Sequence, residues 1–520
     1  MRRVPDAGLP RPTWPLFFLP IALGLALALP DTTRGQCQAN ELAKLTACDA
    51  AAGDEFGISV SISGDVAVIG ARWDDDGGPV SGSAYVYRLN RATGEWEEEA
   101  KLTASDAAPS DEFGRSVSIC NEVVVIGARF DDDGGSTSGS AYVYRFNGSG
   151  WVEEAKLTAS DAAANDLFGI SVSISGDVAV IGALYDSDDG FHSGSAYVYR
   201  FDGAIWVEEA KLTASDAAEG DLFGRSVSIS GDVAVIGAFL DDDAGLDSGS
   251  AYVYRFDGRD WVEEAKLTAS DATADDHFGG SVSVSAELAV IGAILDSDGG
   301  SHSGSAYVFR FNGSGWVEEA KLTASDAAAF DWFGWSVSVR GDIAVIGARF
   351  DVDSDPRFDS GSVYVFKEPP GGWVDMTETA KLTASDAGSF DNFGFSVSIS
   401  GDMALMGAWH DDDVCPGDPP NCNSGSAYVF RGFSDCNDNG TLDLCDIADG
   451  TSTDANGNGV PDDCECLADL DGDSSVGILD LLALLPAWGT DPGGPPDFDG
   501  DGTVGILDLL TLLANWGPCP

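Results

Sequence analysis

The stretch that decides the fold is "FGISVSISGDVAVIGALYDSDDGFHSGSAYVYRFDGAIWVEEAKL", residues 168–212, because close copies of it recur along most of the chain. A Phe-Gly pair opens each copy, and the pairs stand roughly 55 residues apart. Their phenylalanines are Phe56, Phe113, Phe168, Phe223, Phe278, Phe333 and Phe393. Periods of this length are typical of propellers, solenoids and other repeat arrays.

Each copy contains four predicted strands. Residues 171–175 alternate small polar with β-branched side chains, and residues 178–183 are apolar throughout, as in a strand covered on both faces. Residues 195–201 are rich in aromatic side chains, whereas residues 206–212 carry the charges expected of an exposed edge. Four antiparallel strands repeated seven times predict an all-β fold, a seven-bladed β-propeller over residues 37–433.

The two ends of the repeat region complement each other. The seventh copy stops after residues 426–433 and lacks its fourth strand. The N-terminal stretch "ELAKLTA", residues 41–47, has the sequence of that missing strand. We therefore expect residues 41–47 to close the ring by pairing at the outer edge of the last blade, an exchange that an open solenoid does not need.

The repeated motifs "FG", "IGA" and "SGSAYVY" resemble the FG-GAP repeat of the integrin α-subunit propeller and its bacterial relatives. The resemblance covers roughly residues 41–433 and implies a ligand-binding propeller whose upper loops recognise a partner. Two features differ from the family pattern. Other residues, such as Arg72, Arg129, Leu184 and Phe239, replace the proline of Gly-Ala-Pro, and the family's calcium loop between the first two strands is here a short turn.

An aspartate-rich loop follows the second strand of every copy. Connections alternate between the two faces of a propeller, so these loops share one face with the loops that join consecutive blades. Three interpretations stay open: calcium binding, recognition of a basic protein or a glycan, and plain turn formation by Asp, Gly and Ser. The candidate residues of this face are Asp74, Asp76, Asp131, Asp133, Asp186, Asp188, Asp241, Asp243, Asp296, Asp298, Asp351, Asp353, Asp411 and Asp413.

The sequence changes character after Phe433. "DCNDNGTLDLCD" from Asp435 and "DANGNGVPDDCE" from Asp454 place oxygen ligands at loop positions 1, 3, 5, 9 and 12, with glycine at the sharp turn. Both resemble thrombospondin type 3 calcium repeats and define a small calcium-binding loop region, residues 434–466. The predicted Ca²⁺ ligands are Asp435, Asn437, Asn439, Asp443, Asp446, Asp454, Asn456, Asn458, Asp462 and Glu465.

Residues 467–520 contain a duplicated loop-helix unit that resembles a dockerin type I module. This resemblance implies a Ca²⁺-dependent tail that binds a cohesin-like module. Leu and Ile at helical spacing predict that each helix buries an apolar stripe against its twin. Where the family usually has polar recognition residues, the chain has Ile-Leu at 478–479 and 506–507. The predicted ligands are Asp469, Asp471, Asp473, Asp480, Asp497, Asp499, Asp501 and Asp508.

Charge and composition indicate an exported protein. The 87 acidic residues outnumber the 27 basic ones, for a net charge of −60, which disfavours nucleic acid as a partner. Arg2 and Arg3 precede an apolar run at residues 16–29, which predicts a signal peptide within residues 1–36. With no later segment long enough to span a membrane, we expect a secreted or cell-surface protein whose ten cysteines form disulfides, Cys415 with Cys422 first among them.

The sequence predicts a binding protein without a catalytic role. Its carboxylates repeat in every blade, whereas a catalytic site requires one asymmetric place. Its four histidines accompany no nucleophile motif: His192, His277, His302 and His410. Four tryptophans suit either sugar stacking or packing: Trp73, Trp332, Trp335 and Trp409. We expect a secreted calcium-binding adhesion or ligand-binding propeller. The alternative is a dockerin-tethered component of an extracellular polysaccharide-binding or polysaccharide-degrading assembly, and a propeller glycosidase or lyase is the remaining option.

Overall fold

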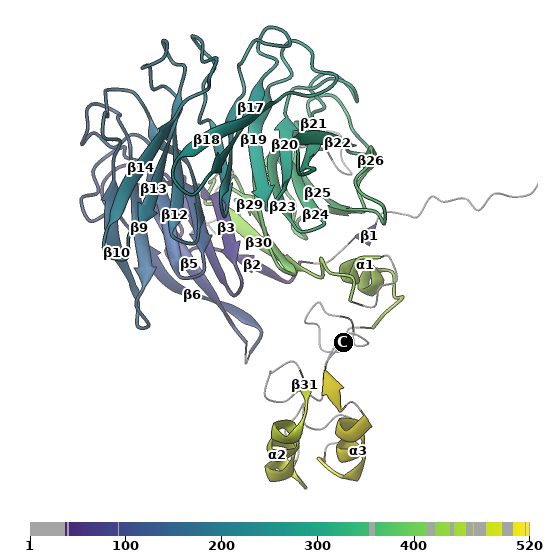
Figure 1. Ribbon diagram of the computed structural model, residues 1–520. Coiled ribbons are helices and arrows are strands. Elements are labelled where there is room, and N and C mark those ends of the chain that lie inside the picture. Colours follow the sequence, from purple (N-terminus) through teal and green to yellow (C-terminus); the bar gives the residue numbers. More distant parts are fainter. Residues whose placement is uncertain are drawn as a thin grey trace, which may run out of the picture. The chain divides into compact units, whose positions relative to one another are not determined.

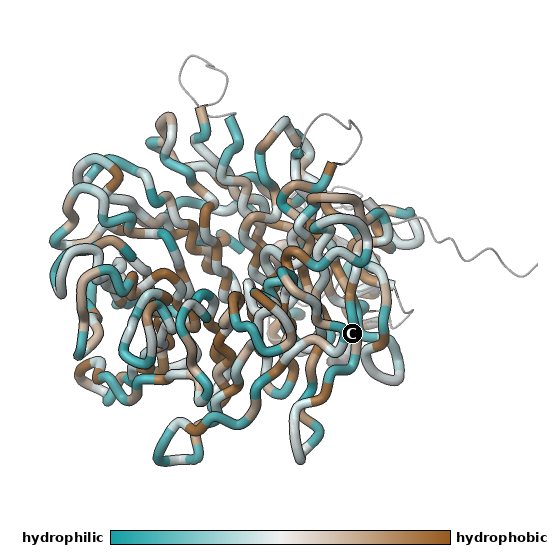
Figure 2. The backbone as a smooth tube through the Cα atoms, turned by 90° about the horizontal axis from the view of Figure 1, so that it is seen from above, coloured by the Kyte–Doolittle hydropathy of each residue, from teal (hydrophilic) through white to brown (hydrophobic). Residues whose placement is uncertain are grey.

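The computed structural model describes residues 37–38, 41–91, 93–352, 359–412, 422–436, 441–453, 461, 475–490, 503–514 and 516–518. Seven sheets surround a central axis (Figures 1 and 2), so the predicted seven-bladed β-propeller is confirmed. The signal peptide predicted within residues 1–36 lies outside the described residues.

The first four blades follow one four-stranded pattern. Blade 1 contains β3 (Phe56–Ser63), β4 (Val66–Ala71), β5 (Ser83–Asn90) and β6 (Glu95–Leu102). Blade 2 contains β7 (Phe113–Cys120), β8 (Val123–Ala128), β9 (Ser140–Phe146) and β10 (Trp151–Leu157). Blade 3 contains β11 (Phe168–Ser175), β12 (Val178–Ala183), β13 (Ser195–Phe201) and β14 (Trp206–Leu212). Blade 4 contains β15 (Ser226–Ser230), β16 (Val233–Ala238), β17 (Ser250–Phe256) and β18 (Trp261–Leu267).

The last three blades draw strands from elsewhere in the chain. Blade 5 contains β19 (Phe278–Ser285), β20 (Leu288–Ala293), β21 (Ser305–Phe311) and β22 (Trp316–Thr323), extended by β26 (Met376–Thr377). Blade 6 contains β23 (Phe333–Arg340), β24 (Ile343–Ala348), β25 (Ser362–Lys367) and β27 (Ala380–Leu382), extended by β1 (Cys37–Gln38). Blade 7 contains β28 (Ser396–Ser400), β29 (Met403–Ala408), β30 (Ser426–Arg431) and, at its outer edge, β2 (Ala43–Leu45).

Two devices close the ring. β2 pairs antiparallel with β30, with Ala43 opposite Val429, so the last blade combines the beginning and the end of the propeller. On the inner strands, a serine hydroxyl of each blade donates a hydrogen bond to the Phe-Gly glycine carbonyl of the next blade. Ser59 bonds Gly114 at 2.8 Å, and Ser396 bonds Gly57 at 2.9 Å, which completes the circle. The remaining bonds join Ser116 to Gly169, Ser171 to Gly224, Ser226 to Gly279, Ser281 to Gly334 and Ser336 to Gly394.

The hydrophobic core lies between neighbouring blades. All six residues of β8 are buried, as the continuous apolar pattern of the second strand predicts. Between blades 1 and 2, Val68 and Val86 pack against Phe113 and Ile126. The blades approach so closely that a Cβ added at Gly127 would lie 2.0 Å from the carbonyl oxygen of Gly169. This contact explains the glycine of the repeated "IGA".

The C-terminal part contains three helices among the described residues: α1 (Asp443–Ala448), α2 (Ile478–Ala487) and α3 (Ile506–Ala514). Leu442 and Leu444, around α1, pack against Tyr428 and Phe430 of blade 7. β31 (Ser475–Val476) pairs with β32 (Gly517–Pro518) beside α2 and α3. No described helix is long and apolar enough to cross a membrane.

The expectation that all ten cysteines form disulfides is wrong. Cys422, Cys436 and Cys445 are disulfide-bonded, but Cys48 and Cys120 are free thiols. Both free thiols replace a serine of the repeat. The Cys120 sulfur accepts a hydrogen bond from the backbone N–H of Gly176 in the next blade, as serine oxygens do in other blades. Cys415, the expected partner of Cys422, lies outside the described residues.

Candidate functional site

The first aspartate of each acidic loop is buried, contrary to the expectation of one exposed carboxylate face. Asp131 accepts hydrogen bonds from the Tyr142 and Ser140 hydroxyls and forms an ion pair with Lys156. Its counterparts in the other blades are Asp74, Asp186, Asp241, Asp296, Asp351 and Asp411, and all seven are between 2% and 4% exposed. These carboxylates hold the loop on the sheet below it.

A lysine from the fourth strand compensates the crowded negative charge. The Lys156 Nζ lies 2.7 Å from Asp106, 2.8 Å from Asp131 and 2.6 Å from Asp133. Burial alone would lower the pKa of Lys156, but the hydrogen bonds to these three carboxylates outweigh it and raise the pKa. In blades 1 to 4 the three carboxylates lie within 4.8 Å of one another. The ammonium group therefore occupies the position at which the calcium interpretation of the loop places an ion.

The other two aspartates of the loop have different roles. The Asp132 carboxylate accepts a 2.6 Å hydrogen bond from the backbone N–H of Thr137 and so caps a turn. The side chain of Asp133 is 64% exposed, as are its counterparts Asp76, Asp188, Asp243 and Asp298 to a similar degree. The last two members of this set, Asp353 and Asp413, lie outside the described residues. In blades 1 to 5, the exposed part of the predicted face is thus the aspartate two positions after the buried one.

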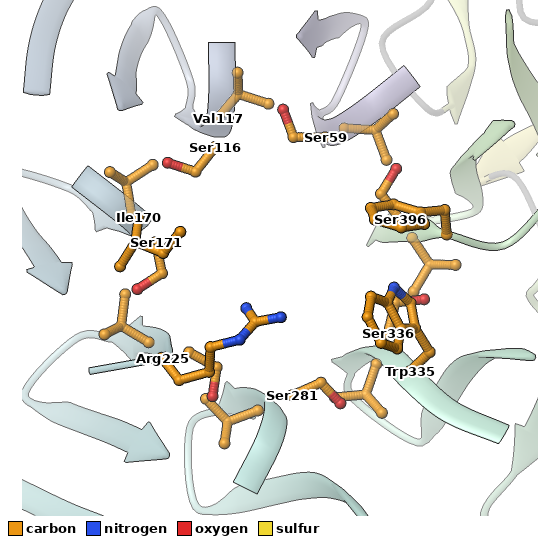
Figure 3. Close-up of a pocket in the computed structure, with 18 of the residues that line it drawn as sticks. Ser59, Ser116, Val117, Ile170, Ser171, Arg225, Ser281, Trp335, Ser336 and Ser396 are labelled. Atoms are coloured by element: carbon orange, nitrogen blue, oxygen red, sulfur yellow. The ribbon is translucent and has the colours of Figure 1, made fainter. Parts of the chain in front are cut away.

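The blades differ from one another at the mouth of the central channel. A cavity of about 240 Å³ opens there, lined by three consecutive residues from the inner strand of every blade (Figure 3). The serines and valines of these triplets repeat, whereas the residue directly after each Phe-Gly pair varies. The variable residues are Ile58, Arg115, Ile170, Arg225, Gly280, Trp335 and Phe395.

Two further variable positions surround this set. One is the residue before each Phe-Gly pair, and the other follows the last alanine of each second strand. The former are Glu55, Glu112, Leu167, Leu222, His277, Trp332 and Asn392, and the latter are Arg72, Arg129, Leu184, Phe239, Ile294, Arg349 and Trp409. We call the three sets together the mouth ring. It is charged in blades 1 and 2, largely aliphatic in blade 3, and aromatic in blades 6 and 7.

The charged side of the mouth ring contains two internal ion pairs. Arg72 binds Glu55 at 2.6 Å, and Arg129 binds Glu112 at 2.8 Å. Burial raises the pKa of Glu55 to about 7, although Arg72 opposes the shift. Arg115, the neighbour of both pairs in the ring, forms no ion pair with a described residue, and its buried Nε has no hydrogen-bond partner among them.

The aromatic side surrounds another arginine. The Arg349 guanidinium lies 3.7 Å from the ring centroid of Trp335, 4.6 Å from that of Trp332 and 4.3 Å from that of Phe350. Burial lowers the pKa of Arg349 to about 9, with Arg225 adding repulsion. Cation–π contacts, rather than a carboxylate, face this charge. Of the tryptophans proposed from sequence for stacking, Trp332, Trp335 and Trp409 belong to this ring.

The residue before each Phe-Gly pair has a left-handed backbone conformation in all seven blades, with φ between 55° and 59°. This conformation costs a non-glycine residue on the order of 1 kcal/mol. Glycine would avoid the cost, yet it stands at none of these seven positions. Two residues earlier in the same loop, glycine does occupy left-handed positions, at Gly53 and Gly220. The mouth ring therefore retains side chains at a strained position.

Five of the predicted tail ligands are among the described residues, and four of these are buried. Asp443, Asp446, Asp480 and Asp508 are 1% to 2% exposed, and buried carboxylates of this kind fit a bound cation. The Asp480 and Asp508 carboxylates each accept a 2.6 Å hydrogen bond from a backbone N–H three residues earlier. Asp435 forms a 2.5 Å ion pair with Lys367. The other predicted ligands lie outside the described residues: Asn437, Asn439, Asp454, Asn456, Asn458, Asp462, Glu465, Asp469, Asp471, Asp473, Asp497, Asp499 and Asp501.

Comparisons with known proteins place the repeats in a family. No curated protein matches the sequence. Among solved structures, the crystal structure of Saccharomyces cerevisiae Sqt1 aligns with a TM-score of 0.39 and 11% identity, covering 76% of this chain and 99% of that chain. Seven segments match the FG-GAP repeat: residues 39–87, 96–144, 151–199, 206–254, 261–309, 316–366 and 376–430. Because these segments make up more than half of the sequence, the chain belongs to the FG-GAP repeat family.

Proposed function

We propose that the protein is an extracellular, non-catalytic binding propeller and that its ligand contacts the mouth ring. The observation that carries this proposal is the seven-fold left-handed position before Phe-Gly, where Glu, Leu, His, Trp and Asn replace the glycine that the backbone favours. Such strain is characteristic of functional positions, and this strained position recurs in all seven blades, three residues before the variable residue that lines the cavity.

The acidic loops are less suited to be the centre of recognition. Two of their three aspartates are engaged in holding the loop, as Asp131 and Asp132 show. The first aspartate of the loop recurs in every blade, and the third-position aspartate recurs in every copy of the repeat, so these carboxylates do not distinguish one blade from another. The mouth ring provides the single asymmetric place that specific binding requires. We assign the exposed aspartates, such as Asp133, to the rim around it.

A variant with a large side chain at the mouth of the central channel tests this proposal. Ile58→Trp fills the mouth from the inner strand, whereas Val207→Trp, at a position 44% exposed on the outer strand β14, adds the same bulk elsewhere. On arrays of neutral and acidic oligosaccharides and of peptides, we expect wild-type protein and Val207→Trp to bind the same ligand. Ile58→Trp should lose at least about tenfold in affinity. Retained binding in Ile58→Trp, with loss in Asp133→Asn and Asp188→Asn together, would assign recognition to the loops instead.

A second function, attachment to an extracellular partner, is favoured by the helical tail. Only part of the apolar surface of α2 and α3 is buried, with Leu484 and Leu512 in a small core with Val476 and Val504. Most of the remaining leucine and isoleucine side chains of both helices are largely exposed. The exposed remainder is duplicated with matched exposure, 67% for both Ile478 and Ile506 and 56% and 55% for Leu482 and Leu510.

We propose that this duplicated apolar surface binds a partner module, as the dockerin-like pattern suggests, and so tethers the propeller to a larger assembly. Ca²⁺, held by the predicted aspartates of each loop including Asp480 and Asp508, would supply the charge that fixes the loop against its helix. The protein's own contribution is the exposed Ile, Leu and Trp surface, which is the usual composition of a docking face.

Chelation of calcium tests the proposal that the tail binds a partner module. Removing calcium with EGTA is expected to reduce the helical signal in circular dichroism and to abolish capture by cohesin modules, because the proposed ligands, including the buried Asp480 and Asp508, then lose the cation that fixes each loop. Leu482→Asp with Leu510→Asp should leave the helical signal unchanged while abolishing capture. The matched pair Thr490→Asp and Thr511→Asp provides a control for added charge. Capture that persists in EGTA, or in the paired leucine variant, would contradict the proposal.

A further inference from the structure

Nearly every described cation of this strongly acidic protein is paired with a carboxylate. All described lysines form ion pairs, and so do the arginines of the third strands, such as Arg145 with Glu154 at 2.9 Å. Four described arginines form none: Arg115, Arg225, Arg340 and Arg349. Arg340 ends β23 and is exposed to solvent, whereas the other three belong to the mouth ring. Unpaired positive charge is therefore concentrated at one place.

Electrostatic repulsion disfavours this clustering of positively charged side chains. Burial lowers the pKa of Arg115 strongly, and repulsion from Arg129, Arg225 and Arg72 lowers it further. Burial and repulsion from Arg129 likewise lower the pKa of Arg225. With a net charge of −60, the protein has carboxylates in excess, yet the two at this side of the ring, Glu55 and Glu112, are paired with Arg72 and Arg129. A bound anion would relieve the remaining repulsion.

The buried side-chain atoms of the mouth ring that lack a hydrogen-bond partner among the described residues are all donors. Four buried nitrogens of the mouth ring have no partner among the described residues: the Nε of Arg115 and Arg349, and the Nε1 of Trp332 and Trp409. Of these four residues, Arg115 lines the cavity of Figure 3, whereas Arg349 and Trp409 line a neighbouring one. A buried donor without an acceptor is unfavourable, because it has given up its hydrogen bond to water. The guanidinium of Arg225 extends toward the open centre of the serine ring (Figure 3), within the cavity that Arg115 also lines. The site thus offers positive charge and donors to whatever enters it.

We propose that the mouth of the central channel binds an oxyanion, a carboxylate or sulfate group, between Arg115 and Arg225. This inference rests on the proposed function and gives its ligand a chemical class. The cavity of about 240 Å³ admits a small anion or the charged end of a larger ligand. Guanidinium groups bind carboxylate and sulfate through paired, charge-assisted hydrogen bonds, which are the strongest contacts available in this channel.

Titration calorimetry of the full chain with sodium citrate and with sodium sulfate, at constant ionic strength in chloride, tests the proposal. We expect wild-type protein to bind at least one of them with a Kd below about 1 mM. Arg115→Gln with Arg225→Gln should weaken binding by at least about tenfold. Arg340→Gln, which removes an unpaired arginine outside the mouth, should bind as wild type does. Arg225→Lys keeps the charge without the paired donors and should fall between them.

The melting temperature distinguishes a variant that has lost folding stability from one that has lost only anion binding. Without ligand, the double glutamine variant should melt no lower than wild type, because it relieves repulsion. Anions should raise the melting temperature of wild type and of Arg340→Gln more than that of the double variant. No heat of binding with either salt up to about 10 mM, or equal binding by the double variant, would overturn the proposal. If anions fail while Ile58→Trp still abolishes array binding, the mouth remains the binding site and only its ligand class is wrong.

Discussion

Gly127→Ala is expected to destabilise the propeller by at least about 3 kcal/mol, with a matching fall in its melting temperature. A Cβ at this position would lie 2.0 Å from the Gly169 carbonyl oxygen and 2.4 Å from the Ser116 hydroxyl oxygen. These two atoms form the hydrogen bond that joins blades 2 and 3. Because one of them is backbone, the methyl group is accommodated only if the blades move apart along their shared core.

The control is Gly150→Ala, in the hairpin between β9 and β10 of the same blade. An added Cβ there meets no atom within 4 Å. We expect its stability to stay within about 0.5 kcal/mol of wild type in thermal or denaturant unfolding. If Gly127→Ala melted at the same temperature as Gly150→Ala, close contact between blades would not be the reason for glycine in "IGA".

The second large effect is expected for Lys156→Met. This change removes the ammonium group among Asp106, Asp131 and Asp133, and Asp131 then remains as an uncompensated buried charge. Loss of one partner of a buried ion pair typically costs about 3–5 kcal/mol. Since three carboxylates converge at this position, we also expect millimolar Ca²⁺ to stabilise the variant more than it stabilises wild type.

Two measurements make this prediction specific. Lys156→Met combined with Asp131→Asn should recover part of the lost stability and lose the extra response to Ca²⁺, because the buried charge is gone. Comparing melting temperatures with and without Ca²⁺ in all three proteins removes the contribution of the tail, which is common to them. A Lys156→Met protein as stable as wild type in EGTA would show that the lysine does not compensate these aspartates.

The fold is predictable because its information is local and repeated. The alternation in residues 171–175 and the continuous apolar run in residues 178–183 indicate strands, and the repeat count indicates seven blades. The burial of Asp131 is not visible in the same way. It depends on the register of β9 and β10, which places Lys156 opposite Tyr142. Only that pairing brings a lysine 25 residues away in sequence onto the first aspartate of the loop.

The mouth ring was not predicted from the sequence for a different reason. The acidic loops attract notice because they recur, but a recurring residue in a propeller mostly serves the contacts that every blade makes. Arg115 and Arg225 follow Phe-Gly pairs where other blades have Ile, Gly, Trp or Phe, so comparison of the copies with one another would have revealed them. The interaction between Arg349 and Trp335 joins different strands of blade 6, and no sequence pattern predicts it.

The antiparallel pairing of β2 with β30 also decides how the propeller responds to mechanical tension. The N-terminal end of β2 lies beside the C-terminal end of β30, since Ala43 is opposite Val429. A force that pulls these two ends apart therefore loads the hydrogen bonds of this pair one after another, as in a zipper. The pairing of β1 with β27 and the packing of Leu442 and Leu444 on blade 7 lie outside this zipper. They bear the load before it reaches the seam of the ring.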